Sequence, residues 1–182
     1  VIELRLFPHL FCKNLTMPSF IGNFVSPNRT AVSLIRWLFL KYLCPSEGKK
    51  IYLKRTNYRI ITNENEVWEI LSRKGFELVQ PEKLTFLEQI QLFSKCDVVI
   101  GNGSGLSNTV FCNKGTKVLN FDSPTWLDIF HWYHAESNDL DYYQMTGIPF
   151  NPTAVINPQT DGCKSFIINI DELKEMLNIM GI

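Results

Sequence analysis

The sequence has no excess of charge of either sign, because 18 lysine and arginine residues balance 18 aspartate and glutamate residues. Proteins that bind nucleic acid usually present a basic stripe, so this balance argues against nucleic acid as a partner. The sequence also has no apolar run of about 18 residues, the length that a membrane-spanning helix requires. The nearest candidate, residues 34–43, is interrupted by Arg36 and Lys41.

Metal-binding and disulfide patterns are absent as well. The five cysteines, at positions 12, 44, 96, 112 and 163, form an odd and widely spaced set that matches neither zinc ligands nor a disulfide framework. We expect reduced thiols, with Cys96 and Cys112 packed as small apolar groups. His131 and His134 lie three residues apart near two acidic residues, but no third ligand is clear. We therefore expect no metal site.

The length of 182 residues, with 45% hydrophobic residues, suits one domain and an extension. Residue 1 is a valine that falls within an apolar pattern, so we expect the chain to be a fragment of a longer protein. We interpret residues 1–45 as a lead-in, with one helix, from an incomplete N-terminal domain. Residues 46–182 are predicted to form one Rossmann-like domain.

Short apolar runs alternate with helical patterns along most of this second part. Strands are predicted at 50–54, 76–79, 96–100 and 117–121, with helices at 63–74 and 86–95 and a short helix before the fourth strand. This order predicts an α/β fold, a parallel sheet with flanking helices.

The flanking stretches are less regular. A helix is expected at 30–43, capped by Thr30, with Trp37 in the core. After residue 122 the pattern predicts a short helix at 127–133, loop over 135–165, a strand at 166–170 and a last helix capped by Asp171.

The stretch from 96 to 122, CDVVIGNGSGLSNTVFCNKGTKVLNFD, organises the domain. Its near-continuous apolar start is typical of a strand covered on both faces. Glycines at 101, 103 and 105 then allow tight turns and close approach of a ligand, beside the polar Ser104 and Asn108. The start of the following helix has free amides and attracts an anion. In parallel sheets, ligands bind outside the carboxyl ends of the strands, where this turn lies.

Two arginines follow the first strand of the domain. Arg55 and Arg59 are four residues apart, and guanidinium groups bind phosphate oxygens through paired hydrogen bonds. An oxyanion site is one interpretation, and two solvated surface arginines are the other.

Other ligand classes fit less well. A dinucleotide-binding unit has glycines after a strand and an acid about twenty residues on, as Gly101, Gly103 and Asp122 do, but position 106 is leucine and the unit is third in the series. A phosphate-binding loop of the GxxxxGK[ST] type and a nucleophile elbow are both missing.

Spaced blocks of residues between 50 and 121 form a pattern that can be compared with known families. They comprise Arg55, Arg59, Ile60, Asn63, Glu64 and Glu66, then Gly75, Phe76, Glu82, Leu84, Glu88, Gln89 and Ile90, then Gly103, Gly105, Leu106, Ser107, Asn108, Phe111 and Gly115. Together these blocks resemble glycosyltransferase family 61. Two positions depart from the family pattern, with Asn102 in place of a histidine and Asn120 in place of a glutamate.

The resemblance implies an inverting glycosyltransferase of the two-domain GT-B type, of which this chain is the C-terminal, donor-binding half. It implies a UDP- or GDP-sugar donor, a glycan or glycoprotein acceptor, as in capsular polysaccharide synthesis, and no metal or other cofactor. The compartment would be cytoplasmic or peripheral to the membrane in a bacterium, and the Golgi or ER lumen in a eukaryote. The implied donor-binding residues are Arg55, Arg59, Asn63, Glu88, Gln89, Asn102, Gly103, Ser104, Gly105 and Asn108.

The catalytic base stays unassigned. Because the amide of Asn102 cannot donate a proton to a leaving group or carry charge near neutral pH, a nucleotide- or sugar-binding module without turnover is the alternative.

Overall fold

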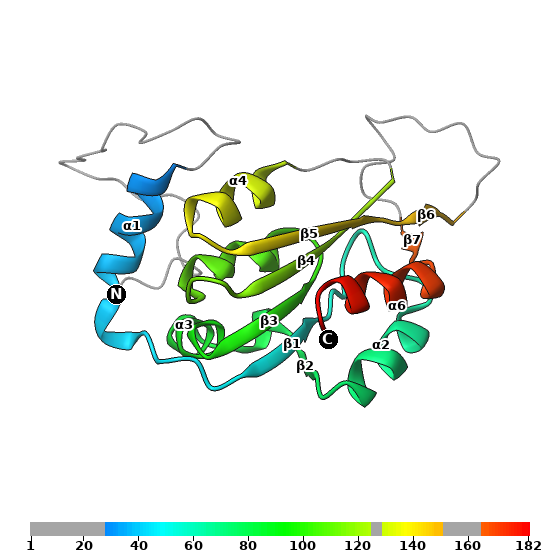
Figure 1. Ribbon diagram of the computed structural model, residues 1–182, viewed down its shortest axis with the longest axis horizontal. Helices are drawn as coiled ribbons and strands as arrows, with labels where there is room; N and C mark the ends of the chain where they lie inside the picture. The colour runs from blue at the N-terminus through cyan, green and yellow to red at the C-terminus, as the bar shows by residue number, and fades with distance from the viewer. Residues whose placement is uncertain (1–27, 125–128, 151–164) are drawn as a thin grey trace, which may run out of the picture.

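The computed structural model describes residues 28–124, 129–150 and 165–182, and its main feature is a parallel sheet of five strands in the order β2-β1-β3-β4-β5 (Figure 1). Every neighbouring pair is parallel. The strands are β1 (Lys49–Leu53), β2 (Glu77–Val79), β3 (Cys96–Gly101), β4 (Lys117–Asp122) and β5 (Asp141–Thr146). The predicted Rossmann-like α/β fold is therefore confirmed.

Helices cover both faces of the sheet (Figure 1). One face carries α2 (Glu64–Arg73) and α6 (Ile170–Ile179), and the other carries α1 (Arg29–Leu38), α3 (Phe86–Ser94), α4 (Phe130–Ser137) and the 3-10 helix η4 (Gly103–Phe111). Two further 3-10 turns, η2 (Leu40–Tyr42) and η3 (Pro81–Lys83), and a small antiparallel ribbon of β6 (Ile148–Pro149) and β7 (Phe166–Ile167) complete the described elements.

The central strand β3 explains why its sequence is almost continuously apolar. Val98 and Ile100 pack into the core beneath α2 and α6, whereas Val99 packs into the core beneath α3 and η4. A strand with apolar cores on both faces needs apolar side chains at successive positions rather than alternate ones. The three side chains are at most 4% exposed.

The predicted loop over 135–165 is wrong for its described part. Residues 130–137 form α4, which extends the short helix predicted at 127–133, and Asp141–Thr146 form the edge strand β5. Only Met145 is buried in β5, so the strand lacks the apolar run that identified its neighbours. Residues 127, 128 and 151–164 of these predictions lie outside the described part of the chain.

Helix α6 begins one residue before the predicted cap. Asn169, not Asp171, caps the helix, because its Oδ1 accepts hydrogen bonds from the backbone N–H of Asp171 (3.0 Å) and Glu172 (3.3 Å). The predicted strand at 166–170 is shortened to Phe166–Ile167 by this early helix start.

Helix α1 also differs from its prediction. Asn28 caps it instead of Thr30, accepting from the Ala31 N–H at 2.9 Å. Trp37 is 68% exposed and so is not part of the core. The helix packs on the domain through Val32 and through Arg36, whose Nη1 donates to the carbonyls of Val110 (2.8 Å) and Cys112 (2.5 Å). A polar side chain thus occupies the inward face, and much of the apolar stripe is turned outward.

Two further features bear on the sequence-based expectations. Cys96 and Cys112 are buried, and burial raises the pKa of the Cys96 thiol to about 12. Among the helices of the described ranges, none has the length and hydropathy needed to cross a bilayer.

Candidate functional site

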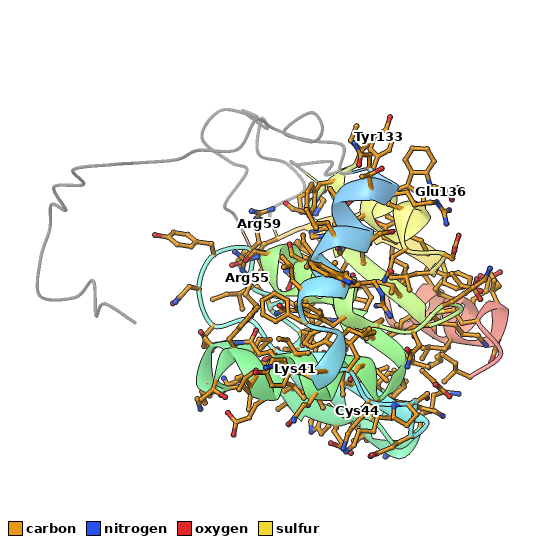
Figure 2. All side chains as sticks on the ribbon, turned by 90° about the vertical axis from the view of Figure 1, so that its left-hand side faces the viewer. Lys41, Cys44, Arg55, Arg59, Tyr133 and Glu136 are labelled. Atoms are coloured by element: carbon orange, nitrogen blue, oxygen red, sulfur yellow. The ribbon has the colours of Figure 1, made fainter. Side chains whose placement is uncertain are left out.

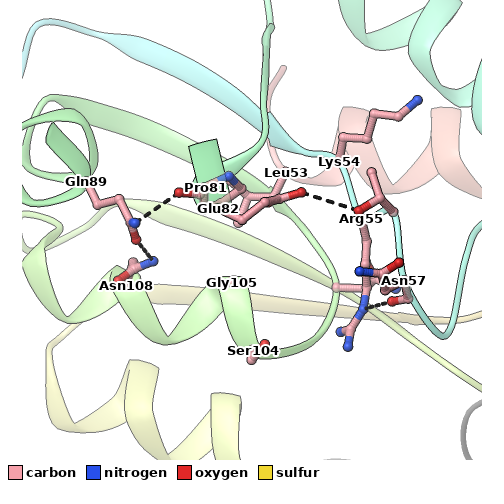
Figure 3. Close-up of a pocket in the computed structure, with 12 residues that line it drawn as sticks. Leu53, Lys54, Arg55, Asn57, Pro81, Glu82, Gln89, Ser104, Gly105 and Asn108 are labelled. Carbon is pink, nitrogen blue, oxygen red and sulfur yellow. Dashed lines mark hydrogen bonds between the residues drawn. The ribbon is translucent and has the colours of Figure 1, made fainter. Parts of the chain in front are cut away.

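The strand order places a crevice at the carboxyl ends of β1 and β3. The chain moves from β1 to β2 on one side of the sheet and later to β3 on the other, which makes this the topological switch point where α/β sheets bind ligands. A cavity of about 360 Å³, here called the carboxyl-end hollow, opens at this point (Figure 3). Its lining residues are Leu53, Lys54, Arg55, Thr56, Asn57, Pro81, Glu82, Gln89, Asn102, Ser104, Gly105 and Asn108.

Glycines allow the floor of the hollow to lie close to β1. A Cβ built on Gly101 would lie 2.7 Å from the Cβ of Leu53, so no larger residue fits there without movement. Gly103 has a φ of +68°, in the left-handed region, and begins η4. The short helix predicted here is thus a 3-10 helix of nine residues. Its first amides, near Ser104 and Gly105, have no acceptors within the helix.

Arg55 lies directly over Gly103. A Cβ on Gly103 would be 1.6 Å from Arg55 Nη1, so the guanidinium occupies the space that a side chain would otherwise fill. Arg55 Nε donates to the carbonyl of Asn57 at 2.8 Å, which bends the loop around the side chain (Figure 3). The predicted arginine and glycine features therefore meet in one place.

Arg59 is linked to the same floor through its backbone. Its carbonyl accepts a hydrogen bond from Asn102 Nδ2 at 2.8 Å. Its Nε is buried and has no hydrogen-bond partner in the part of the chain that the structure describes. In the view of Figure 2, Arg55 and Arg59 are both seen at the same edge of the molecule.

Gln89 and Asn108 brace one wall of the hollow. Gln89 Nε2 donates to the carbonyls of Pro81 (2.9 Å) and Leu84 (3.1 Å), and its Oε1 accepts from Asn108 Nδ2 at 2.8 Å (Figure 3). The pair joins the turn η3 to η4 across the start of α3. Both residues line the hollow, with part of their hydrogen-bonding capacity used for this brace.

Four residues of the predicted set do not line the hollow, namely Arg59, Asn63, Glu88 and Gly103. Glu88 forms a capping box with Thr85, because its Oε2 accepts from the Thr85 N–H and Oγ1, both at 2.7 Å. These hydrogen bonds lower the pKa of the Glu88 carboxyl. Asn63 uses its side-chain amide to pair with the backbone of Ile168, donating at 2.8 Å and accepting at 3.0 Å.

Sequence reasoning missed several residues that line the hollow, namely Lys54, Thr56, Asn57 and Glu82. Lys54 is paired with Glu64 at 2.6 Å, and Glu82 is the only carboxylate among the lining residues. The first three simply continue β1 beyond its end, so the rule that ligands bind beyond the carboxyl ends of strands already pointed to them.

A buried polar cluster lies at the neighbouring ends of β4 and β5. The Asp122 carboxylate accepts from Asn120 Nδ2 (2.8 Å) and Gln144 Nε2 (2.6 Å), and Asn120 Nδ2 also donates to Tyr142 Oη at 3.0 Å. Asn120, one of the two departures from the family pattern, is thus fully buried and holds the strand ends together.

The two histidines of α4 are also buried in this part of the fold. His134 Nδ1 lies 3.2 Å from Thr109 Oγ1 in η4, and burial, with the nearby His131, lowers the pKa of His134 to about 4. Among the described residues, no group of three or more His, Cys, Asp or Glu side chains is arranged to hold a metal ion. The expectation of a metal-independent protein stays a prediction.

Comparison with known proteins identifies the family. No curated protein matches the chain. The model of the family described as Glycosyltransferase 61 matches residues 2–119, which include both arginines, the glycine turn and the brace of Gln89 and Asn108. A dinucleotide-binding unit would place its glycine turn after the first strand, whereas here the turn follows β3. The chain belongs to glycosyltransferase family 61.

Proposed function

We propose that this chain is the donor-binding domain of an inverting glycosyltransferase of the two-domain GT-B type. It holds a UDP- or GDP-sugar whose sugar is transferred to a glycan or glycoprotein acceptor. The observation that carries the proposal is the packing of the Arg55 guanidinium on Gly103 inside the carboxyl-end hollow. This packing gives a cation and free helix-start amides at the switch point, which suits a sugar-linked diphosphate.

The proposed chemistry is stabilisation of the leaving group. As the bond between the sugar and the diphosphate breaks, negative charge develops on the departing diphosphate oxygens. A fixed guanidinium and the amides near Ser104 and Gly105 would stabilise that charge, because donors already in place need no reorganisation as the charge forms. We expect this arrangement to replace the divalent cation that other phosphate-transfer sites use, so activity should survive chelation with EDTA.

A second candidate function is donor binding without turnover. It is favoured by the hydrogen bond of Asn102 to the Arg59 carbonyl, since a neutral amide held in this way cannot shuttle a proton. Glu82, the one carboxylate that lines the hollow in the described part of the chain, is exposed. An acceptor hydroxyl must lose a proton in an inverting transfer, and the catalytic base remains unassigned.

The test begins with binding of UDP and GDP to this chain, measured by isothermal titration calorimetry with and without EDTA. Arg55→Ala should weaken binding by about 10- to 100-fold, because a charge-assisted hydrogen bond contributes on the order of 1.5–3 kcal/mol. Lys114→Ala is the matched control, since this exposed cation lies beyond the opposite, amino-terminal end of the sheet. Its removal should change affinity less than twofold. Absence of binding by the wild type, or equal effects of the two variants, would overturn the proposal.

Turnover separates the two candidates. Donor hydrolysis or sugar transfer by the full-length protein, followed by mass spectrometry of the products, supports the enzyme. If the full-length protein binds UDP or GDP but never releases the sugar from its donor, the second candidate, a binding module without turnover, is supported.

A further inference from the structure

The loop between β1 and α2 contains two consecutive residues in the left-handed region. Tyr58 has a φ of +53° and Arg59 a φ of +48°, and neither is glycine. Bulky L-residues rarely adopt this conformation because Cβ approaches the following carbonyl, so it persists only where the surroundings enforce it. Such strained residues cluster at ligand-binding sites.

Asn102 provides the hydrogen bond that holds this strained pair against the sheet. Its Nδ2 donates to the Arg59 carbonyl at 2.8 Å, across 43 positions of sequence. Asn102 directly follows the buried strand β3 and is only 6% exposed, so the donor is fixed by the sheet itself. Just beyond the pair, the Ile60 carbonyl accepts from the Phe166 N–H at 3.1 Å, which anchors the end of the loop.

The strained pair determines where the Arg59 guanidinium lies. The Arg59 carbonyl is bonded to Asn102, and Asn102 directly precedes Gly103, the position that Arg55 covers. Arg59 is not itself a lining residue of the hollow, but its Nε is buried and has no partner in the described ranges, so a strong donor with unused hydrogen-bonding capacity lies on the residue that Asn102 holds.

We propose that Asn102 is a positioning residue, which holds the left-handed Tyr58–Arg59 backbone so that Arg59 joins Arg55 in binding the diphosphate of the donor. The inference rests on the proposed function, which it deepens. In this arrangement Asn102 acts on the donor through Arg59, since one N–H of its amide serves the Arg59 carbonyl. A side chain at position 102 must therefore donate a hydrogen bond, and an imidazole N–H meets the same requirement.

The test is a double-mutant cycle on binding of UDP and of inorganic pyrophosphate, measured by calorimetry. Asn102→Ala and Arg59→Ala should each weaken binding of both probes by roughly 10-fold or more. The double variant should bind no more weakly than Arg59→Ala alone, since without the guanidinium nothing remains to be positioned. Asn102→His should recover most of the affinity lost in Asn102→Ala.

Asn113→Ala is the matched control for loss of structure. Asn113 Nδ2 donates to the backbone carbonyl of Ser94 at 2.6 Å, near the amino end of β4, so its removal deletes a similar bond far from the hollow. The control should lower the melting temperature and leave UDP and pyrophosphate affinity unchanged. If Asn102→Ala unfolds the chain, Asn102→His and Asn102→Gln are compared instead. Both side chains keep an N–H donor, but they carry it at different distances from the backbone.

The outcomes separate this inference from the proposed function. Losses that multiply in the double variant would show that Asn102 contacts the ligand itself, and an unaltered affinity in Asn102→Ala would show that it positions nothing; either result overturns the inference alone. Failure of the wild type to bind UDP, GDP and pyrophosphate overturns the proposed function together with it.

Discussion

Two hollows of nearly equal size lie at opposite ends of the parallel sheet. The carboxyl-end hollow has a volume of about 360 Å³, and the second, here called the amino-end hollow, about 380 Å³. Three lysines line the amino-end hollow, so charge alone would have favoured it as the anion site. Its lining residues are Ser46, Lys50, Asp97, Val98, Asn113, Lys114, Gly115, Thr116, Lys117, Gly181 and Ile182.

The two hollows differ in what their polar groups already bind. In the amino-end hollow, Lys50 Nζ donates to the carbonyl of Lys74 at 3.3 Å, Lys117 Nζ donates to the carbonyl of Met180, and Ser46 Oγ donates to Asp97. At the carboxyl end, Arg59 is held by Asn102, which lines the hollow; its buried Nε has no partner among the described residues, and the backbone around it is strained. Unused donors on a fixed framework, rather than volume or net charge, distinguish a prospective anion site.

The strongest test of this difference between the hollows uses one glycine from each end of the sheet. Gly103 and Gly115 both have left-handed backbones, with φ values of +68° and +78°. A Cβ on Gly103 would displace the Arg55 guanidinium, whereas a Cβ on Gly115 meets nothing within 4 Å. Gly103→Ala should therefore weaken UDP binding by about 100-fold, because the main cation is displaced from its position and the floor is altered.

Gly115→Ala is the control for backbone strain. Each alanine should reduce the free energy of unfolding by about 1–2 kcal/mol, since both force an L-residue into the left-handed region. Calorimetry and urea denaturation of the two variants measure affinity and stability separately. Equal affinity losses at both ends would mean that strain, and not the displaced arginine, controls binding.

The contact between α4 and η4 should also limit stability in acid. The pKa of His134 is lowered from 6.5 to about 4 by burial against η4 and by His131. The unfolded chain therefore binds a proton that the folded chain resists, so stability is full above about pH 6.5 and falls as the pH drops toward 4. The full loss is about 3 kcal/mol, measurable by urea denaturation between pH 7 and 4.

His134→Gln should remove that dependence. The difference in unfolding free energy between the variant and the wild type then shrinks as the pH falls, because only the wild type must keep a buried imidazole neutral. Parallel pH profiles for the two proteins would assign the acid sensitivity to other groups.

The brace of the hollow wall predicts a smaller effect. Gln89→Ala deletes two donated hydrogen bonds and one accepted from Asn108, which should cost about 2 kcal/mol of stability. Gln91→Ala, two residues along the same helix and exposed, should cost almost nothing. Thermal denaturation of the pair measures the difference, and comparable melting temperatures would show that the brace does not stabilise the wall.

The parts of the fold that were predicted share a simple physical cause. A strand buried on both faces, such as β3, must be apolar at successive positions, and that run is visible in the sequence. The edge strand β5 has no such constraint, because it pairs on one side only and buries only Met145. Its tyrosines and Gln144 gave no strand pattern, so the sequence could not distinguish it from loop.

The candidate site likewise contains features that could be predicted from the sequence and features that could not. The proximity of Arg55 and Gly103 could be predicted from the sequence, because the carboxyl ends of neighbouring parallel strands lie at the same edge of the sheet. The role of Asn63 could not be predicted from the sequence, since its hydrogen-bond partner Ile168 lies 105 positions away along the chain. The role of Glu88 was readable, because Thr85 precedes it by three residues in the pattern of a capping box.

Glu88 provides the last and smallest prediction. Because its carboxylate is held by Thr85 and it does not line the hollow, Glu88→Ala should lower the melting temperature slightly through loss of the helix cap. The affinity of the Glu88→Ala variant for UDP should equal that of the wild type, whereas removal of a residue that binds the donor would reduce the affinity. Calorimetry at neutral pH decides, since hydrogen bonds from Thr85 lower the pKa of Glu88 and keep it ionised there. A marked loss of affinity would extend the donor site beyond the hollow, along the first turn of α3.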